Sequence, residues 1–297
     1  MFSLSTWLHL RIPFSYLLLP VFLFALSISP NITTEKLLWT FILIHFFLYP
    51  ASNGYNSYFD KDEKSIGLLR NPPPVKRSLY VISLLFDVIA VVVGFITVNF
   101  SFSAMLLIYG LVSKAYSHPS IRLKKYAITS WIITGFFQGM FTFLMCYVGI
   151  NNFGIENCLK PLVLCGGLLT TLMLWANYPI TQVYQHEEDG KRGDRTFSMM
   201  LGIRGTFYFV GIVFALVAVA FFIYFAYFFN IRYGIALLLA LMPVVIFFTF
   251  WFSQIIKSES FANYSNAMWL SLISATCLNV FFVYFFLDST HIADAFQ

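Results

Sequence analysis

Apolar residues in this chain fall into long runs separated by short polar stretches. A transmembrane helix needs roughly 20 consecutive apolar residues. Runs of about that length cover residues 13–30, 37–55, 79–99, 102–117, 129–149, 161–184, 206–229, 233–254 and 266–287. Helices are expected rather than strands, because a helix satisfies its backbone hydrogen bonds within itself in lipid. The pattern predicts an all-α fold, a polytopic membrane bundle of about nine transmembrane helices, with residues 1–297 as one domain.

The composition supports a lipid bilayer as the surroundings of this chain. The mean hydropathy is +0.78, and only 10% of the residues are charged, whereas soluble domains carry about 25%. An ordinary soluble domain is therefore excluded. The first run resembles a signal peptide, with Ala25-Leu26-Ser27 like a cleavage site, but it is long and only Arg11 precedes it. We expect an uncleaved first helix.

The basic residues are distributed asymmetrically between the two sides of the predicted bundle. If the N-terminus is cytoplasmic, 14 of the 18 Lys and Arg residues lie on that side. This bias predicts an N-in, C-out protein, and the chain fits a bacterial inner (cell) membrane. The same bias explains the net charge of +5, so no nucleic-acid partner is expected.

Two polar segments, residues 53–64 and 184–196, follow the second and sixth runs and face the cytoplasm in this topology. Asn56 and Asp60 are four residues apart and would share one helix face, with Glu63 and Lys64 close to it. Gln185 and Asp189 repeat the spacing, and Gln182 lies on the same side. Such oxygen ligands suit Mg²⁺, which is usually completed by substrate phosphate oxygens. Nearby basic residues could balance the remaining charge of a bound diphosphate: Arg70, Lys124, Lys191 and Arg192.

Charged residues also occur in ordinary loops next to a membrane, which is the simpler interpretation of either segment alone. Two matching segments on the same side favour a site for a metal-bridged anion at the mouth of a membrane cavity.

The motifs in these segments resemble those of the UbiA superfamily of intramembrane prenyltransferases. Asn56 and Asp60 fit the family's N-x-x-x-D-x-x-x-D motif, and Asp189 with Gly193 and Thr196 fits the second motif, D-x-x-x-D. The loop after the fourth run, from Tyr116 to Lys124, is similar to the family's Y-S-x-P-x-x-R-L-K stretch.

Two positions depart from the family pattern. Lys64 stands where the first motif ends in Asp, and Gln185 stands where the second begins with Asp, so two of the usual four carboxylates are missing. Either Asp62 or Glu63 replaces the first and Glu187 or Glu188 the second, or Lys64 contacts the diphosphate directly.

The resemblance implies a role for each matching residue. Asp60 and Asp189 are the expected catalytic residues. Metal ligands are expected among Asn56, Asp60, Glu63, Glu188 and Asp189. Substrate contacts are expected from Asn56, Lys64, Arg70, Tyr116, Arg122, Lys124, Gln185, Lys191 and Arg192.

The implied activity is Mg²⁺-assisted ionisation of an allylic prenyl diphosphate and transfer of the prenyl group to a hydrophobic or aromatic acceptor. A membrane terpene cyclase, which needs no acceptor, and a non-catalytic binder of lipid diphosphates remain alternatives. A transporter is disfavoured, because the charges gather at one face of the bundle rather than near the middle of the bilayer.

Overall fold

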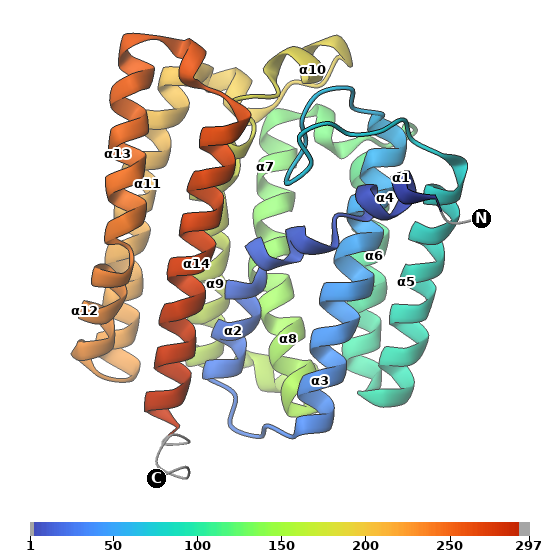
Figure 1. The fold of residues 1–297 in the computed structure, drawn as a ribbon. Coiled ribbons are helices and arrows are strands. Elements are labelled where there is room, and N and C mark those ends of the chain that lie inside the picture. Colours follow the sequence, from blue (N-terminus) through green and yellow to red (C-terminus); the bar gives the residue numbers. More distant parts are fainter. Residues whose placement is uncertain (1–2, 291–297) are drawn as a thin grey trace.

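The computed structural model describes residues 3–290, and within them helices account for almost all regular structure (Figure 1). No strand occurs in this range apart from an isolated pairing of Ile66 with Leu69. The first seven α-helices are α1 (Leu4–Leu10), α2 (Leu19–Ser27), α3 (Thr34–Ile42), α4 (Tyr49–Asp60), α5 (Arg77–Thr97), α6 (Phe100–Ser117) and α7 (Ala127–Phe136). The others are α8 (Thr142–Asn151), α9 (Pro161–Asn177), α10 (His186–Lys191), α11 (Phe197–Phe228), α12 (Ile231–Ala240), α13 (Met242–Lys257) and α14 (Tyr264–Ser289).

Short 3₁₀ and π segments join several of these helices into longer rods. A π segment, η2 (Leu43–Leu48), makes α3 and α4 continuous, and another, η4 (Phe137–Phe141), joins α7 to α8. The 3₁₀ segment η6 (Tyr178–Thr181) extends α9. The remaining 3₁₀ segments are η1 (Ile12–Leu17), η3 (Leu123–Lys125), η5 (Ile155–Leu159) and η7 (Glu259–Phe261).

The predicted all-α membrane bundle is confirmed, with nine as an approximate number of spans. Each predicted apolar run lies on a helical segment. Among the described residues, seven rods are long and apolar enough to cross a membrane, and a bent pair at the start would be an eighth. The fourth run, which is the shortest, forms α6 and packs against α4, α5 and α8.

The first run is not one straight helix. The segments Leu4–Leu17 and Leu19–Ser27 meet at an angle of 42°. Arg11, between α1 and η1, has a left-handed backbone with φ of 47°, and Pro13 and Pro20 lie in the first turns of η1 and α2. Proline lacks the N–H that would continue a preceding helix. These positions therefore divide the run into short pieces.

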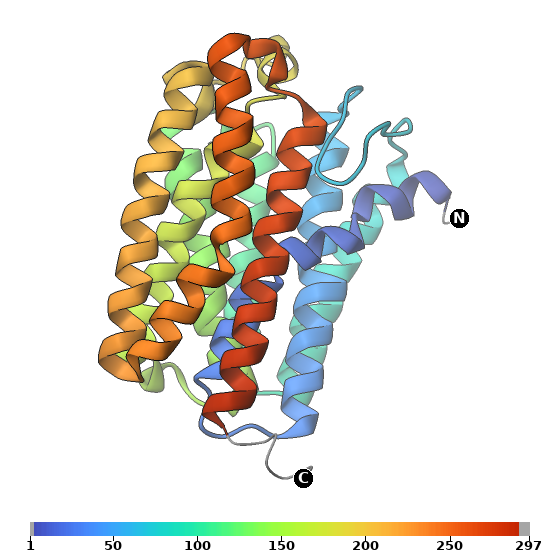
Figure 2. The same cartoon turned by 60° about the vertical axis from the view of Figure 1, so that its left-hand side comes forward.

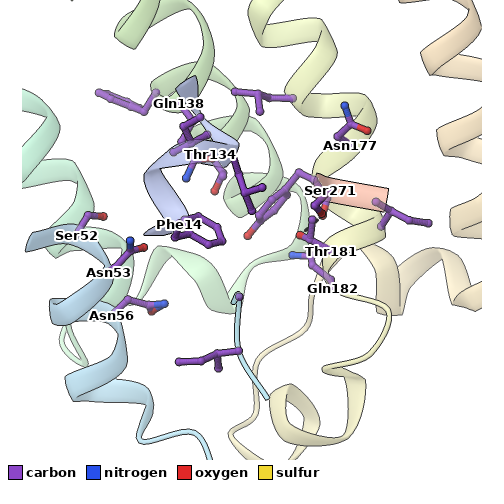
Figure 3. A pocket seen from close by; sticks show the side chains of 18 of the residues that line it. Phe14, Ser52, Asn53, Asn56, Thr134, Gln138, Asn177, Thr181, Gln182 and Ser271 are labelled. Carbon is purple, nitrogen blue, oxygen red and sulfur yellow. Dashed lines mark hydrogen bonds between the residues drawn. The ribbon is translucent and has the colours of Figure 1, made fainter. Parts of the chain in front are cut away.

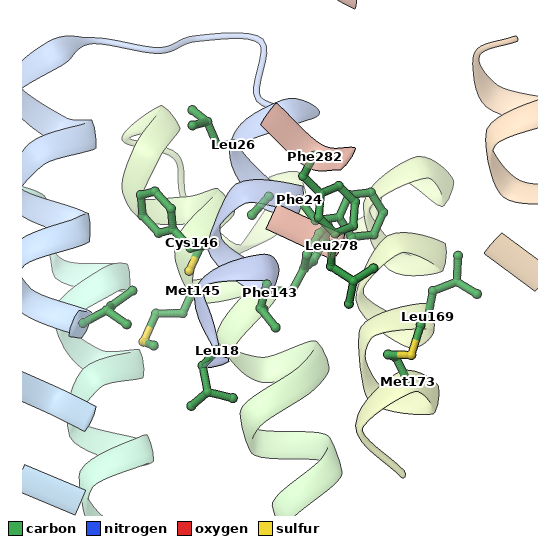
Figure 4. Packing of buried hydrophobic residues seen from close by; sticks show 14 of the residues in the cluster. Leu18, Phe24, Leu26, Phe143, Met145, Cys146, Leu169, Met173, Leu278 and Phe282 are labelled. Carbon is green, nitrogen blue, oxygen red and sulfur yellow. The ribbon is translucent and has the colours of Figure 1, made fainter. Parts of the chain in front are cut away.

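The centre of the bundle is packed with aromatic rings from α2, α8, α11 and α14, among them Phe24, Phe143 and Phe282 (Figure 4). Phe24 of α2 is fully buried; its ring stacks on Phe282 of α14 at 4.7 Å and lies 5.0 Å from Phe143 of α8. Such ring pairs contribute about 0.5–1.5 kcal/mol beyond their burial. Leu278 and Phe282 of this cluster also line a cavity, so the packed core closes its inner end.

Both polar segments lie at the same end of the bundle. This end carries the last turn of α4, the whole of α10 and the first turn of α11, whereas the α2–α3 connection lies at the opposite end (Figures 1 and 2). The fold therefore brings together two segments that are more than a hundred residues apart in sequence.

Candidate functional site

A cavity of about 360 Å³ extends inward from the end of the bundle that carries the polar segments. Asn53 and Asn56 of α4 lie on one side of it, and Asn177, Thr181 and Gln182 lie on the other (Figure 3). Its charged lining residues come from the polar segments and two neighbouring parts of the chain: Arg11, Asp60, Asp62, Lys124, Asp189, Arg192 and Asp194.

The first segment places Asn56 and Asp60 on one face of α4, as the spacing predicts, and both line the cavity. Lys124 forms an ion pair with Asp60, and its Nζ also donates to Asn56 Oδ1 at 3.3 Å. Ser117 Oγ donates to the same Asn56 oxygen at 3.0 Å. The Asp60 and Lys124 side chains are only 6% and 8% exposed. Lys124, from the loop after α6, thus lies in the cavity wall beside Asn56 and Asp60.

The chain beyond Asp60 is not helical. Helix α4 ends at Asp60, and Lys61 caps it with a left-handed backbone at φ of 51°. Helical spacing therefore does not apply to Glu63 and Lys64, which are exposed and absent from the cavity lining. Asp62 lines the cavity instead, with a side chain that is 7% exposed and paired with Arg192.

The second segment forms the short helix α10, and Gln185 precedes it. The Asp189 N–H donates to the Gln185 carbonyl at 2.9 Å, so the two residues are one turn apart, and both line the cavity. Arg192 Nη2 donates to Asp189 Oδ1 at 2.6 Å. Because Arg192 also pairs with Asp62, it links the two segments across the mouth. Burial raises the pKa of Asp189 to about 6, although Arg192 opposes that shift.

Asp194 is a cavity residue that the spacing argument missed. Gly193 adopts a left-handed backbone with φ of 75°, and the Asp194 N–H then donates back to the Asp189 carbonyl at 2.9 Å. The Asp194 carboxylate accepts from Arg122 Nε and Nη2 at 2.8 and 2.9 Å, and these bonds raise the pKa of Arg122. The available signal was Gly193, which permits a turn that returns the next residue to the site.

Arg11 also lines the cavity, although the sequence pattern offered it only as a charge before the first helix. Its Nη2 donates to Asn53 Oδ1 at 3.3 Å, and its guanidinium lies 5.3 Å from the centre of the Phe14 ring. Among the described residues, no carboxylate lies within ion-pair distance of Arg11. A cation without a paired carboxylate is therefore available to an anion.

The other predicted residues divide between the cavity wall and the outer surface. Tyr116 lines the cavity, and its hydroxyl is 2.6 Å from that of Tyr178. Glu188 is 4.0 Å from Arg192 but does not line the cavity. Lys64 and Lys191 both pair with Glu187 at the surface, and Arg70 is exposed. The cavity lining therefore lacks six of the predicted residues: Glu63, Lys64, Arg70, Arg122, Glu188 and Lys191.

Away from the charged mouth the cavity wall consists of uncharged polar and apolar side chains. Gln138, Thr170 and Asn177 supply uncharged polar groups. Four phenylalanines, from η1, η4, α11 and α14, also line the cavity: Phe14, Phe137, Phe221 and Phe282. Such a wall suits a ligand with a charged end and a hydrocarbon chain.

Without a bound substrate, the oxygen ligands at the mouth of the cavity form only an incomplete site for Mg²⁺. Within residues 3–290, no three His, Cys, Asp or Glu side chains are close enough together to hold a metal. Each cavity carboxylate is paired with a cation: Asp60 with Lys124, Asp62 and Asp189 with Arg192, and Asp194 with Arg122. Carboxylate and amide oxygens are nevertheless the ligands that Mg²⁺ uses with substrate phosphates. The residues fit a metal that enters together with a phosphate ligand.

Residues 17–273 match the model of the UbiA prenyltransferase family. The chain belongs to this family. UbiA members are prenyltransferases, so prenyl transfer is the activity at family level. No sequence among the curated proteins matches the chain.

Solved structures show the same UbiA fold. A UbiA homologue from Archaeoglobus fulgidus bound to GPP and Mg²⁺ is 18% identical, with a TM-score of 0.63, and the match covers 95% of this chain and 99% of that one. The same homologue bound to DMAPP and Mg²⁺ gives a TM-score of 0.61 at 18% identity, covering 94% and 97%. A digeranylgeranylglyceryl phosphate synthase is 19% identical, with a TM-score of 0.59, covering 95% and 96%.

Proposed function

We propose that this UbiA protein transfers the prenyl group of an allylic prenyl diphosphate to a hydrophobic acceptor, with Mg²⁺ as cofactor. The observation that carries the proposal is a cavity whose mouth holds four carboxylates and three cations, and whose wall becomes apolar further in. A prenyl diphosphate has the matching division between a charged head and a hydrocarbon chain. The binding of GPP, DMAPP and Mg²⁺ by the archaeal homologue supports this choice.

The number of carboxylates that line the cavity supports a catalytic site rather than one that has lost its metal ligands. The family pattern has four aspartates, and this chain lacks two of them, at Lys64 and Gln185. The cavity is nevertheless lined by four: Asp60, Asp62, Asp189 and Asp194. We infer that Asp62 and Asp194 supply the two missing charges. This assignment favours catalysis over a non-catalytic lipid-diphosphate binder.

The protein's own groups have distinct roles in ionising the donor. Mg²⁺, held by the mouth carboxylates with Asn56, would supply positive charge to the departing diphosphate. Arg192 and Lys124 would turn from their carboxylate partners toward phosphate oxygens, and Arg11 already lacks such a partner among the described residues. Preorganised positive charge of this kind stabilises negative charge that develops as a bond breaks.

The deeper wall would protect the allylic carbocation that ionisation leaves. Phe14, Phe137, Phe221 and Phe282 line the cavity, and each aromatic face could attract a cation by about 0.5–2 kcal/mol. An apolar wall also keeps water from the cation before the acceptor reaches it. The acceptor's nucleophilic atom then forms the new bond to the allylic carbon, and its proton passes to solvent or diphosphate.

Substitution of the two principal carboxylates tests the site. Asp60→Asn and Asp189→Asn should each lower Mg²⁺-dependent pyrophosphate release from geranyl diphosphate in the presence of a long-chain phenol by about 100-fold or more, as loss of a transition-state contact typically does. Glu259→Gln is a matched control at the same end of the bundle, because Glu259 is half-exposed and pairs with Arg204 outside the cavity. Wild-type rates in both Asp variants would overturn the site assignment.

A further inference from the structure

A second, almost wholly apolar cavity of about 240 Å³ lies between α11, α13 and α14. Helix α11 contributes Val210, Gly211, Phe214, Ala215 and Ala218, and α13 contributes Val244, Val245, Phe248 and Thr249. The cavity exists because several of these α11 residues are small. A Cβ added at Gly211, for example, would lie only 3.3 Å from the Phe248 ring. Only Asn177 and Thr249 contribute polar side chains.

This second cavity adjoins the main one and also reaches the lipid-facing surface. Asn177 and Leu270 line both cavities. On the outer side, Val245 is 42% exposed and Thr249 is exposed, on a helix rod that is long and apolar enough to cross the membrane. The space therefore lies between the lipid-facing surface of the bundle and the side of the main cavity.

We propose that this second cavity binds the hydrocarbon chain of the acceptor, which makes the acceptor an amphiphilic membrane lipid with a long apolar tail. The inference rests on the proposed prenyl transfer. The donor chain is expected in the main cavity, because the diphosphate site at the mouth opens directly onto the wall of Phe137, Phe221 and Phe282. The acceptor must then approach that chain from the side, and the second cavity offers such an approach.

Asn177 is placed to orient the acceptor's polar group at the junction. It is the last residue of α9 and lines both cavities. Among the described residues its amide has no hydrogen-bond partner, so its donors and acceptor are available to a ligand. A hydroxyl or phenol held there would lie between its own tail and the donor chain.

The test is photolabelling of the protein in phosphatidylcholine vesicles with a long-chain para-alkylphenol that carries a diazirine at the end of its chain. We expect the label on the α11 and α13 residues that line the second cavity, identified by peptide mass spectrometry. Addition of geranyl diphosphate and Mg²⁺ should leave this labelling in place. Displacement by the donor would overturn the proposal, because the cavity would then hold the donor chain.

Two filling variants and a control separate specific binding from contact with bulk lipid. Ala215→Phe should lower labelling in the cavity several-fold. If Ala215→Phe does not fold, Ala218→Leu takes its place and should have the same effect. Leu216→Phe adds similar bulk to α11 at a residue that is 65% exposed and outside the cavity lining, and it should leave labelling unchanged. Equal labelling in all variants, or equal labelling of lipid-facing residues elsewhere on α11, would overturn the proposal. Pyrophosphate release measured in the same preparation shows separately whether the proposed donor chemistry is present.

Discussion

At the level of single residues, the ion pair between Asp62 and Arg192 joins the two polar segments. Arg192 pairs with Asp62 from the first segment and with Asp189 from the second. Its neighbouring carboxylates raise the pKa of Arg192 even though burial, the largest influence, acts in the opposite direction. The guanidinium therefore remains charged and holds the mouth of the cavity together until an anionic ligand competes for it.

A change of charge should matter at Asp62 and not at Lys64. Lys64→Asp restores the family's motif letter, but Lys64 lies outside the cavity with a side chain that is 54% exposed. The variant loses only a surface ion pair, which contributes about 0–1 kcal/mol, so Mg²⁺-dependent pyrophosphate release should stay near the wild-type rate. Asp62→Asn should reduce it by about 10-fold or more, because it removes charge from the mouth.

The outcome that would contradict this assignment is the reverse order of effects. A large loss of activity in Lys64→Asp with a normal rate in Asp62→Asn would show that Lys64 contacts the diphosphate directly. The apparent affinity for Mg²⁺, measured for both variants, identifies which side chain influences the metal.

At the scale of elements, the ends and breaks of helices position the site. Helix α4 ends at Asp60, Gly193 turns the chain after α10, and the Thr196 hydroxyl then caps α11 by accepting from the Met199 N–H at 3.3 Å. A further break occurs at Gly139, where the backbone departs from helical angles inside η4. This break lies beside Phe137 and Gln138, which line the cavity.

Gly139 should tolerate no side chain. A Cβ there would lie 2.6 Å from the Thr171 Cα and 2.7 Å from its backbone nitrogen, so α9 would have to move. We expect Gly139→Ala to destabilise the protein by about 1–3 kcal/mol, as overpacking typically does, and to lower the melting temperature in detergent. Gly205→Ala is the matched control, because its Cβ would make only an ordinary 3.5 Å contact within α11. Equal melting temperatures for both variants would contradict this account.

These element ends also explain which parts of the site could be predicted from sequence. The apolar runs located the helices, since their period and length reflect burial in lipid. The spacing correctly placed Asn56, Asp60, Gln185 and Asp189 along the cavity, because each pair lies within one helical turn. The prediction that Glu63 and Lys64 lie near the same helix face as Asp60 was wrong, because α4 ends before Lys61.

Asp194 and Arg11 could not be placed by local periodicity. Asp194 returns to the cavity through a turn at Gly193, and Arg11 lies on the segment Leu4–Leu17, which meets Leu19–Ser27 at 42°. The bend turns α1 and η1, dark blue in Figure 2, away from the direction of α2. Both residues depend on tertiary packing and on left-handed backbone positions, at Gly193 and at Arg11 itself.

At the scale of the whole molecule, the bundle has one polar functional end and should have one orientation. Glu35 lies at the start of α3 with a side chain that is 67% exposed, and Lys257 is exposed at the other end of the bundle, where α13 ends. In a variant without the native cysteines, an impermeant maleimide should label Glu35→Cys in intact bacterial cells. It should label Lys257→Cys only after permeabilisation. The opposite pattern would contradict the predicted cytoplasmic position of the site.

In the proposed reaction, this cavity ionises an allylic prenyl diphosphate for transfer to an acceptor. The most direct measurement is pyrophosphate release by the purified wild-type protein from geranyl, farnesyl and geranylgeranyl diphosphates, with Mg²⁺ or with a chelator, and with or without long-chain phenols. We expect release that requires both Mg²⁺ and an acceptor, together with a prenylated product. Release that needs no acceptor and yields a terpene hydrocarbon or alcohol would contradict transfer and indicate a cyclase. Tight donor binding without release under every condition would contradict catalysis and indicate a binder.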